Sequence, residues 1–126
     1  MENARIVVVD DHPFIVDILS QILTREGYTV ASASDGREGL TLIQKIQPDL
    51  VLIDWSLPGL GGIDVIKQLR ATGNRLRIIT ITANASARYT ALHYGSDDFL
   101  TKPFHLKEIV RLVKTWSSQS LSQTSQ

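Results

Sequence analysis

The sequence predicts an α/β fold in which helices cover both faces of a parallel sheet. Short runs of β-type residues alternate five times with longer stretches in which apolar residues have helical spacing. The runs at 6–9 and 50–53 contain only Val, Ile and Leu, which is typical of strands buried on both faces. Such strict alternation favours right-handed crossovers and a doubly wound, five-stranded (βα)5 architecture.

Each of the ten elements has a local signal for its start or its end. We expect strands at 5–9, 28–33, 50–54, 77–82 and 97–101, and helices at 13–26, 36–47, 63–72, 85–94 and 106–116. Pro13 suits a first helical turn, and Gly27 and Gly73 follow the last turns of two helices. Asp35 and Glu38 have the spacing of a capping box at the start of the second helix.

The fourth predicted helix has an unusual apolar face. Alanines and Leu92 supply most of its apolar residues. Because small side chains bury little area, we expect this helix to be the least firmly packed of the five.

Length and composition indicate one domain followed by a polar tail. A chain of 126 residues can form a single hydrophobic core, and we place this domain at 1–117. Residues 118–126 are rich in Ser and Gln with one apolar residue, Leu121, which predicts a disordered tail or the start of a linker. A linker-like tail favours the first domain of a longer regulator over a stand-alone protein.

Composition narrows the class of protein. The 13 basic and 13 acidic residues balance, so charge gives no indication of direct nucleic-acid or membrane binding. The absence of cysteine excludes disulfides, thiolate catalysis and cysteine-ligated metals. The apolar runs are far too short to span a bilayer, and no signal-peptide core follows Met1. We therefore expect a cytoplasmic protein.

Polar and charged residues follow the apolar strands, at the edge where ligands bind in open α/β sheets. Because the carboxyl ends of parallel strands share one edge, five side chains should converge there: Asp10, Asp11, Asp54, Thr82 and Lys102. Carboxylates about 4 Å apart repel by about 4 kcal/mol per pair at an effective dielectric near 20, so three of them need a cation. A donor set of oxygens favours Mg²⁺ or Mn²⁺ over zinc.

A metal ion, a carboxylate, a hydroxyl and an ammonium group are together typical of phosphoryl transfer, which depends on positioning and charge neutralisation. In this interpretation Asp54 is the nucleophile and forms an aspartyl phosphate. Asp10 and Asp11 hold the metal, while Lys102 neutralises phosphoryl oxygens and Thr82 hydrogen-bonds one of them. The alternative is that Asp54 only caps its loop and that the other residues are coincidental strand-end polarity.

Four segments, in order and at matching spacing, resemble the receiver domain of bacterial two-component response regulators over about residues 4–117. They are VVVDDHPF at 7–14, PDLVLIDWSLPGLGG at 48–62, ITITAN at 79–84 and GSDDFLTKPF at 95–104. The resemblance implies the flavodoxin-like strand order 2-1-3-4-5 of the chemotaxis regulators. It also implies that the chain is a signalling phosphoacceptor that assists only its own phosphorylation and dephosphorylation, and not an enzyme acting on other substrates.

The resemblance implies roles for the acidic residues. Asp54 would accept a phosphoryl group from a sensor histidine kinase or a phosphotransfer protein. Mg²⁺, or alternatively Mn²⁺, would be held by Asp10, Asp11 and Asp54 together with the backbone carbonyl of Ser56.

The resemblance also implies a switch. Thr82 and Lys102 would be the switch residues, and Phe99 would turn inward when Thr82 moves toward the phosphoryl group. The peptide bond before Pro103 would be cis. The helix at 85–94, the strand at 97–101 and the last helix would form the surface that a partner, a C-terminal effector domain or a second copy reads.

Several positions depart from the commonest pattern of the family. Gly61 stands where an acid is frequent, and Trp55 is a bulky residue directly after the proposed phosphoacceptor. Ser56 and Asn84 occupy positions that tune dephosphorylation in relatives, so the lifetime of the phosphoryl group is not predicted. Leu112 stands where the dimer face of a DNA-binding subfamily has a basic residue, although Lys107, Glu108 and Lys114 resemble that face.

Two other functions share parts of this pattern. A flavodoxin-like cofactor-binding module has the same strand order, but it needs phosphate-cradling loops of Gly, Ser and Thr where this chain has acids. A phosphatase with an aspartyl intermediate needs a second acid two residues after the nucleophile, where this chain has Ser56.

The remaining polar and aromatic residues have simpler interpretations. Asp97 and Asp98 lie at the opposite edge of the sheet, where we expect a solvated turn or an interface charge pair. The three histidines lie in different segments, so a zinc site is not expected, and His12 is interpreted as a loop residue that borders the acidic pocket. Trp116 is interpreted as a half-buried packing residue.

Overall fold

The computed structural model describes residues 4–124, with side chains described for 4–118. Its five strands are parallel and lie in the order β2-β1-β3-β4-β5. They span Arg5–Val9 (β1), Thr29–Ala33 (β2), Leu50–Asp54 (β3), Arg77–Thr82 (β4) and Asp98–Thr101 (β5). The predicted sheet and its strand order are confirmed.

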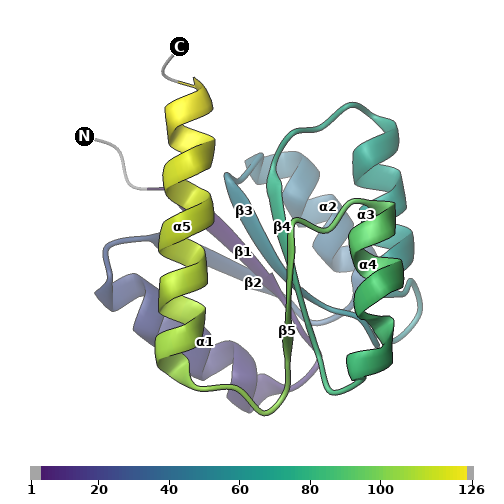
Figure 1. Cartoon of the computed structure of the whole chain (residues 1–126), viewed down its shortest axis with the longest axis horizontal. Helices are drawn as coiled ribbons and strands as arrows, with labels where there is room; N and C mark the ends of the chain where they lie inside the picture. The colour runs from purple at the N-terminus through teal and green to yellow at the C-terminus, as the bar shows by residue number, and fades with distance from the viewer. Residues whose placement is uncertain (1–3, 125–126) are drawn as a thin grey trace.

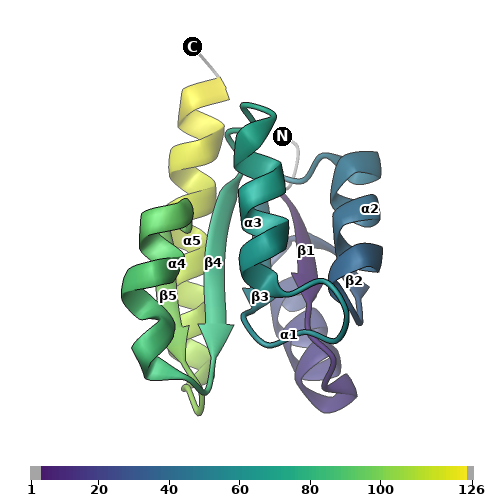
Figure 2. The same ribbon diagram turned by 90° about the vertical axis from the view of Figure 1, so that its right-hand side faces the viewer.

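Helices cover both faces of this sheet (Figures 1 and 2). Helices α1 and α5 pack on one face, and α2, α3 and α4 lie on the other. The helices span Pro13–Arg25 (α1), Gly36–Ile46 (α2), Gly62–Ala71 (α3), Arg88–Tyr94 (α4) and Leu106–Thr124 (α5), with a 3-10 turn at Ala85–Ala87 before α4.

Strand β3 lies at the centre of the sheet, and all of its residues are buried. Val51 and Ile53 pack into the hydrophobic cluster under α2 and α3, whereas Leu50 and Leu52 pack into the cluster under α1 and α5. A strand covered on both faces requires apolar residues at every position, which explains the continuous apolar run. Asp54 is the first polar residue at its carboxyl end.

The strand register sets which residues become neighbours at the carboxyl edge. Val9 is paired with Ile53, so Asp10, one residue further along, lies beside Asp54. On the other side of β3, Asp54 is paired with Ile81, the residue before Thr82. The backbone N–H of Lys102 donates to the carbonyl of Thr82 at 2.8 Å, which brings the end of β5 to the same edge.

Helix α2 begins at the predicted cap. The Asp35 carboxylate accepts a hydrogen bond from the backbone N–H of Glu38 at 2.7 Å, and the Glu38 carboxylate accepts one from the backbone N–H of Ser34 at 3.1 Å. In a standard capping box the second hydrogen bond comes from the backbone N–H of the N-cap residue, here Asp35. In this helix it comes from the residue before, Ser34, and the two bonds together satisfy backbone donors at the start of the helix. The capped turn lies against the loop that follows β3, because Gly36 approaches the backbone of Leu60.

Helix α4 is shorter than predicted, and Leu92, one of the apolar residues counted for it, lies outside its buried face. Ala87 and Ala91 are buried, but Leu92 is 37% exposed. The two alanines are four residues apart and share a face, whereas Leu92 is rotated from Ala91 by about 100°, which turns it outward. The buried face of α4 therefore consists of small side chains.

Helix α5 continues through the Ser/Gln-rich segment to Thr124. The helix thus passes the expected domain end at 117 and includes 118–124, while 125–126 lie outside the described residues; that this segment begins a linker stays a prediction. A helix whose first turns are fixed by packing extends through polar residues at a cost of only a few tenths of a kcal/mol each, so low hydrophobicity alone does not end it.

The acidic pair at the start of β5 is held inside the molecule. Asp97 pairs with Arg70 at 3.0 Å and with Arg77 at 3.4 Å, and Asp98 accepts a hydrogen bond from the Trp116 indole N–H at 2.9 Å. The expected solvated turn or interface pair is thus replaced by internal ion pairs. Burial lowers the pKa of Arg70 more than Asp97 raises it.

The length and the hydropathy of a helix decide whether it can cross a membrane. In the described part of the chain, no helix combines the length and the hydropathy that a membrane span requires.

Gly36→Ala tests the contact between α2 and the loop after β3. A Cβ at this position would overlap the carbonyl oxygen of Leu60, so backbone must move. Although alanine favours a helix, we expect the variant to lose about 1–3 kcal/mol of unfolding free energy, measured by urea titration. Thr41→Ala, at an exposed position of the same helix, is the control and should change stability by less than about 0.5 kcal/mol. Equal stability of both variants and wild type would contradict the expected clash.

Candidate functional site

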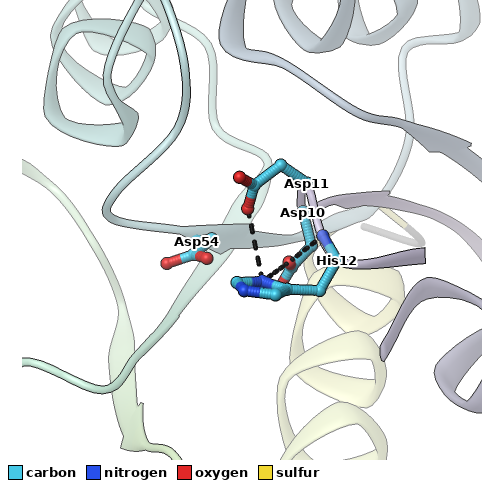
Figure 3. A group of neighbouring side chains, drawn as sticks. All are labelled: Asp10, Asp11, His12 and Asp54. Carbon is cyan, nitrogen blue, oxygen red and sulfur yellow. Dashed lines mark hydrogen bonds and ion pairs between the residues drawn. The ribbon is translucent and has the colours of Figure 1, made fainter. Parts of the chain in front are cut away.

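The predicted acidic residues meet at the carboxyl edge of the sheet. Asp10, Asp11, His12 and Asp54 each offer a ligand atom, and these atoms lie within 4.8 Å of one another (Figure 3). Asp10 and Asp54 are each 3% exposed, whereas Asp11 and His12 are exposed. The carboxyl edge therefore carries both buried and solvent-facing donors.

A cavity of about 510 Å³, open to solvent, gives access to this cluster. Its lining includes Asp54, Thr82 and Lys102, which the sequence predicts to act together, as well as Ser56 and Asn84. The cavity therefore connects the Asp54 carboxylate with solvent.

Lys102 joins the two buried carboxylates. Its Nζ lies 2.9 Å from Oδ2 of Asp10 and 3.1 Å from Oδ2 of Asp54. Burial lowers the pKa of Lys102, but the hydrogen bonds and charges of Asp10 and Asp54 outweigh burial, so the pKa lies above its ordinary value. Lys102 is therefore a permanent cation at neutral pH, positioned between two strand ends.

The charges of the site do not balance without a further cation. Three carboxylates face one ammonium group, and the accessible donors are carboxylate oxygens with one imidazole nitrogen. Such a hard, anionic donor set fits a divalent metal ion. Asp10, Asp11 and Asp54 have the positions to hold it, and the Ser56 backbone adjoins them, since its N–H donates to Oδ1 of Asp54 at 3.2 Å.

Thr82 lies at the end of β4, on the other side of Asp54 from Asp10. Its side chain is buried, and its hydroxyl oxygen accepts a hydrogen bond from the backbone N–H of Asn84 at 3.3 Å. The hydroxyl is thus engaged with the loop that leads into α4. The peptide bond between Lys102 and Pro103 is cis.

Trp55 connects the site to α4. It directly follows Asp54 and packs against a small cluster of Ala87, Ala91 and Phe99. Phe99 is 5% exposed, so it faces inward in this structure. Sequence reasoning treated Trp55 only as a bulky neighbour of Asp54, and its contact with α4 became visible only from the packing.

Sequence reasoning also underestimated His12. Its Nδ1 lies 2.9 Å from Oδ1 of Asp10 and 3.3 Å from Oδ1 of Asp11, inside the acidic cluster (Figure 3). Its contact with the acidic pair could have been expected from its position directly after that pair, in the strand-to-helix turn, where a side chain can fold back over the preceding residues.

The family is decided by comparison with known proteins. Residues 6–114 match the model of the response regulator receiver domain. The chain belongs to this family. Its function is that of the receiver domain of a two-component response regulator, and its buried acidic pocket, parallel sheet and strand order agree with this membership. The flavodoxin-like cofactor-binding alternative is not favoured.

Curated relatives are longer than this chain. Response regulator MprA of Mycolicibacterium vanbaalenii is 44% identical over 108 residues, which cover 84% of this chain and 47% of that protein. DNA-binding response regulator MtrA of Mycolicibacterium smegmatis is 40% identical, with 87% and 49% covered. The chain spans about half the length of the curated relatives it matches.

Solved structures of receiver domains have the same fold. The receiver domain of the Francisella response regulator 1452 superposes with a TM-score of 0.89 at 32% identity, covering 94% of this chain and 99% of that chain. Response regulator TrrA of Thermotoga maritima, solved in complex with Mg²⁺ and BeF, superposes with a TM-score of 0.83 at 33% identity, covering 90% and 98%.

Lys102→Met tests the ion pairs at the centre of the site. Removing the ammonium leaves Asp10 and Asp54 facing each other, so without divalent ions at pH 7 we expect a loss of about 1–3 kcal/mol of unfolding free energy. The pKa of Lys102 is raised in the folded state. The stability that its ammonium group contributes is therefore fully present below the unfolded-state pKa of about 10.4 and is lost as pH rises through the folded-state pKa.

Urea titrations of wild type and variant between pH 7 and pH 11 measure this difference. It should be constant up to about pH 10 and narrow above that. Lys107→Met, an exposed lysine on α5, is the control and should differ from wild type by less than about 0.5 kcal/mol throughout. A difference that grows with pH would contradict the role assigned to the Lys102 ion pairs.

Proposed function

We propose that Asp54 is the phosphoacceptor of this receiver domain and that the modified domain presents a changed surface on α4, β5 and α5. The observation that supports this most directly is the placement of Asp54. Its carboxylate is buried, ends the central strand, borders a solvent-open cavity and contacts the Lys102 ammonium at 3.1 Å.

In the proposed reaction, a carboxylate oxygen of Asp54 attacks the phosphorus of a phosphorylated histidine. The new O–P bond forms as the P–N bond breaks, and the imidazole leaves. Lys102 lies beside the attacking carboxylate, where its charge stabilises the phosphoryl oxygens as they approach. The hydroxyl of Thr82, one residue beyond the pairing partner of Asp54, would exchange its bond to the Asn84 N–H for a bond to the phosphoryl group.

The donor set fits Mg²⁺, and we propose that Asp10, Asp11 and Asp54, with the Ser56 carbonyl, hold it. When bound, the ion would neutralise charge on the phosphoryl oxygens. This assignment is supported by the structure of TrrA, a response regulator similar to this chain, which was solved in complex with Mg²⁺ and BeF. The same oxygen donors would also accept Mn²⁺.

The partners follow from the family and from the length of the relatives. We propose a sensor histidine kinase or phosphotransfer protein as phosphodonor, a cytoplasmic location and an effector domain beyond the end of this chain. The support for the effector domain is that relatives named as DNA-binding regulators are about twice as long as the match. A dimer through α4, β5 and α5 remains a prediction, and Lys114, one of its three charged residues, forms an ion pair with Glu26 of the same chain at 3.1 Å.

Asp54→Asn tests the phosphoacceptor. Wild-type chain incubated with acetyl phosphate and Mg²⁺ should gain one phosphate in intact mass spectrometry, and the variant should gain none because the amide is not a nucleophile. Asp64→Asn, an exposed acid in the first turn of α3, should be phosphorylated as wild type. Phosphate uptake by the Asp54 variant would overturn the assignment. Turnover of phosphomonoesters by the wild-type chain would instead indicate a phosphatase.

Thr82→Ala tests the switch. In the proposed switch, the Thr82 hydroxyl couples the phosphoryl group to the loop before α4 and so to the buried cluster of Ala87, Ala91 and Phe99. The variant should therefore still take up phosphate, but this cluster should no longer respond to it. The response is measured as the change in the methyl NMR shifts of Ala87 and Ala91, which pack on Phe99. Thr72→Ala, at the far end of α3, should keep both uptake and response. A full response in the Thr82 variant would show that another residue carries the coupling.

A further inference from the structure

His12 is turned toward the acidic cluster and away from the helix it precedes. It occupies the N-cap position of α1, yet its side chain makes no capping hydrogen bond. Instead, its backbone N–H donates to Oδ1 of Asp10 at 2.9 Å, and its ring Nδ1 lies 2.9 Å from the same oxygen. The chain therefore folds back at this residue and holds the ring over the carboxylates (Figure 3).

The spacing of these atoms is that of ligands around one small ion. With metal–ligand bonds of about 2.1 Å in an octahedral site, neighbouring ligand atoms lie about 3.0 Å apart and opposite ones about 4.2 Å apart. His12 Nδ1 lies 2.9 Å from Oδ1 of Asp10 and 3.3 Å from Oδ1 of Asp11. Both distances match neighbouring ligands. The whole set with Asp54 spans up to 4.8 Å, more than the distance between opposite ligands, so the set must contract by a few tenths of an ångström to close on one ion.

Lys102 does not compete with His12 for the same atoms. The ammonium contacts Oδ2 of Asp10 and Oδ2 of Asp54, whereas the imidazole contacts Oδ1 of Asp10. Oδ2 of Asp10 therefore contacts Lys102, and Oδ1 of Asp10 faces the side of the cluster where Asp11 and His12 lie. A metal ion on that side leaves the Lys102 ion pairs intact.

We propose that His12 Nδ1 is a metal ligand, so that the site is a mixed nitrogen–oxygen site that prefers first-row transition ions such as Mn²⁺, Co²⁺ and Ni²⁺ to Mg²⁺. This inference rests on the metal site of the proposed function. Imidazole is a good ligand for transition ions, whereas Mg²⁺ prefers oxygen. The ring is 63% exposed, so ligation through Nδ1 leaves the Nε2 proton in contact with water.

Calorimetric titration with Co²⁺ and with Mg²⁺ tests the preference. We compare the wild-type chain with His12→Ala and with His12→Phe, which keeps an aromatic ring but has no nitrogen. The variants should lose about tenfold or more in Co²⁺ affinity and change in Mg²⁺ affinity by less than about threefold. A double variant, His93→Ala with His105→Ala, is the matched control for binding at surface histidines and should bind both ions as wild type.

Pulsed EPR of the Mn²⁺-loaded chain tests the bond itself. We expect a nitrogen-14 coupling in wild type and in the double control, and none in either His12 variant. Absence of the coupling in wild type, or equal losses for Co²⁺ and Mg²⁺ in the variants, would overturn the proposal. Phosphorylation of Asp54 is measured separately by mass spectrometry, so a chain that shows the coupling but takes up no phosphate refutes the proposed function and leaves the His12 assignment standing.

Discussion

The structure depends on a pairing of two buried carboxylates that the strand register enforces. Because β1 and β3 run parallel and Val9 pairs with Ile53, the buried carboxylates of Asp10 and Asp54 lie side by side at the carboxyl edge of the sheet. Such an arrangement is unfavourable unless cations are supplied. Lys102, directly after β5 and two strands away from β3, supplies one cation, and the negative charge that remains fits the divalent ion proposed for this site. The repulsion between the two carboxylates therefore favours the binding of a cation at this edge of the sheet.

The hydrophobic core offsets the unfavourable repulsion between the carboxylates of Asp10 and Asp54. The two clusters pack against both faces of β3, so a displacement that separated the carboxylates would disturb buried apolar contacts on both sides of the sheet. Close backbone contacts reinforce the position from outside the sheet, since Gly62 lies against the carbonyl of Asp54 and Gly36 against that of Leu60. The stability of the core and the reactivity of the site are thus linked through the same residues of β3.

Local patterns were sufficient to predict the features that depend on burial and on the shared edge of parallel strands, whereas the strand order came from the family resemblance. The apolar run of β3 predicted a central strand, and the shared edge of parallel strands predicted that Asp10, Asp54, Thr82 and Lys102 meet. Features that depend on side-chain direction were not predictable. The ring of His12 folds back onto Asp10, Leu92 turns outward, and Asp97 finds Arg70 and Arg77 inside the molecule. The continuation of α5 beyond residue 117 was not predicted, because composition reports the tendency to form a core and not the propagation of an existing helix.

Strand β5 has a neighbour on one side only. It is four residues long, forms the edge of the sheet, and carries Phe99 together with the chain that leads to Lys102. An edge strand can slide or tilt without breaking hydrogen bonds on its outer side, whereas a movement of β3 would disrupt two ladders at once. The proposed phosphoacceptor Asp54 therefore lies on a strand that is hydrogen-bonded on both sides, and Phe99 lies on a strand that is hydrogen-bonded on one side. A shift of the reporting side chain would thus disturb fewer backbone hydrogen bonds than a shift of the residue that receives the phosphoryl group.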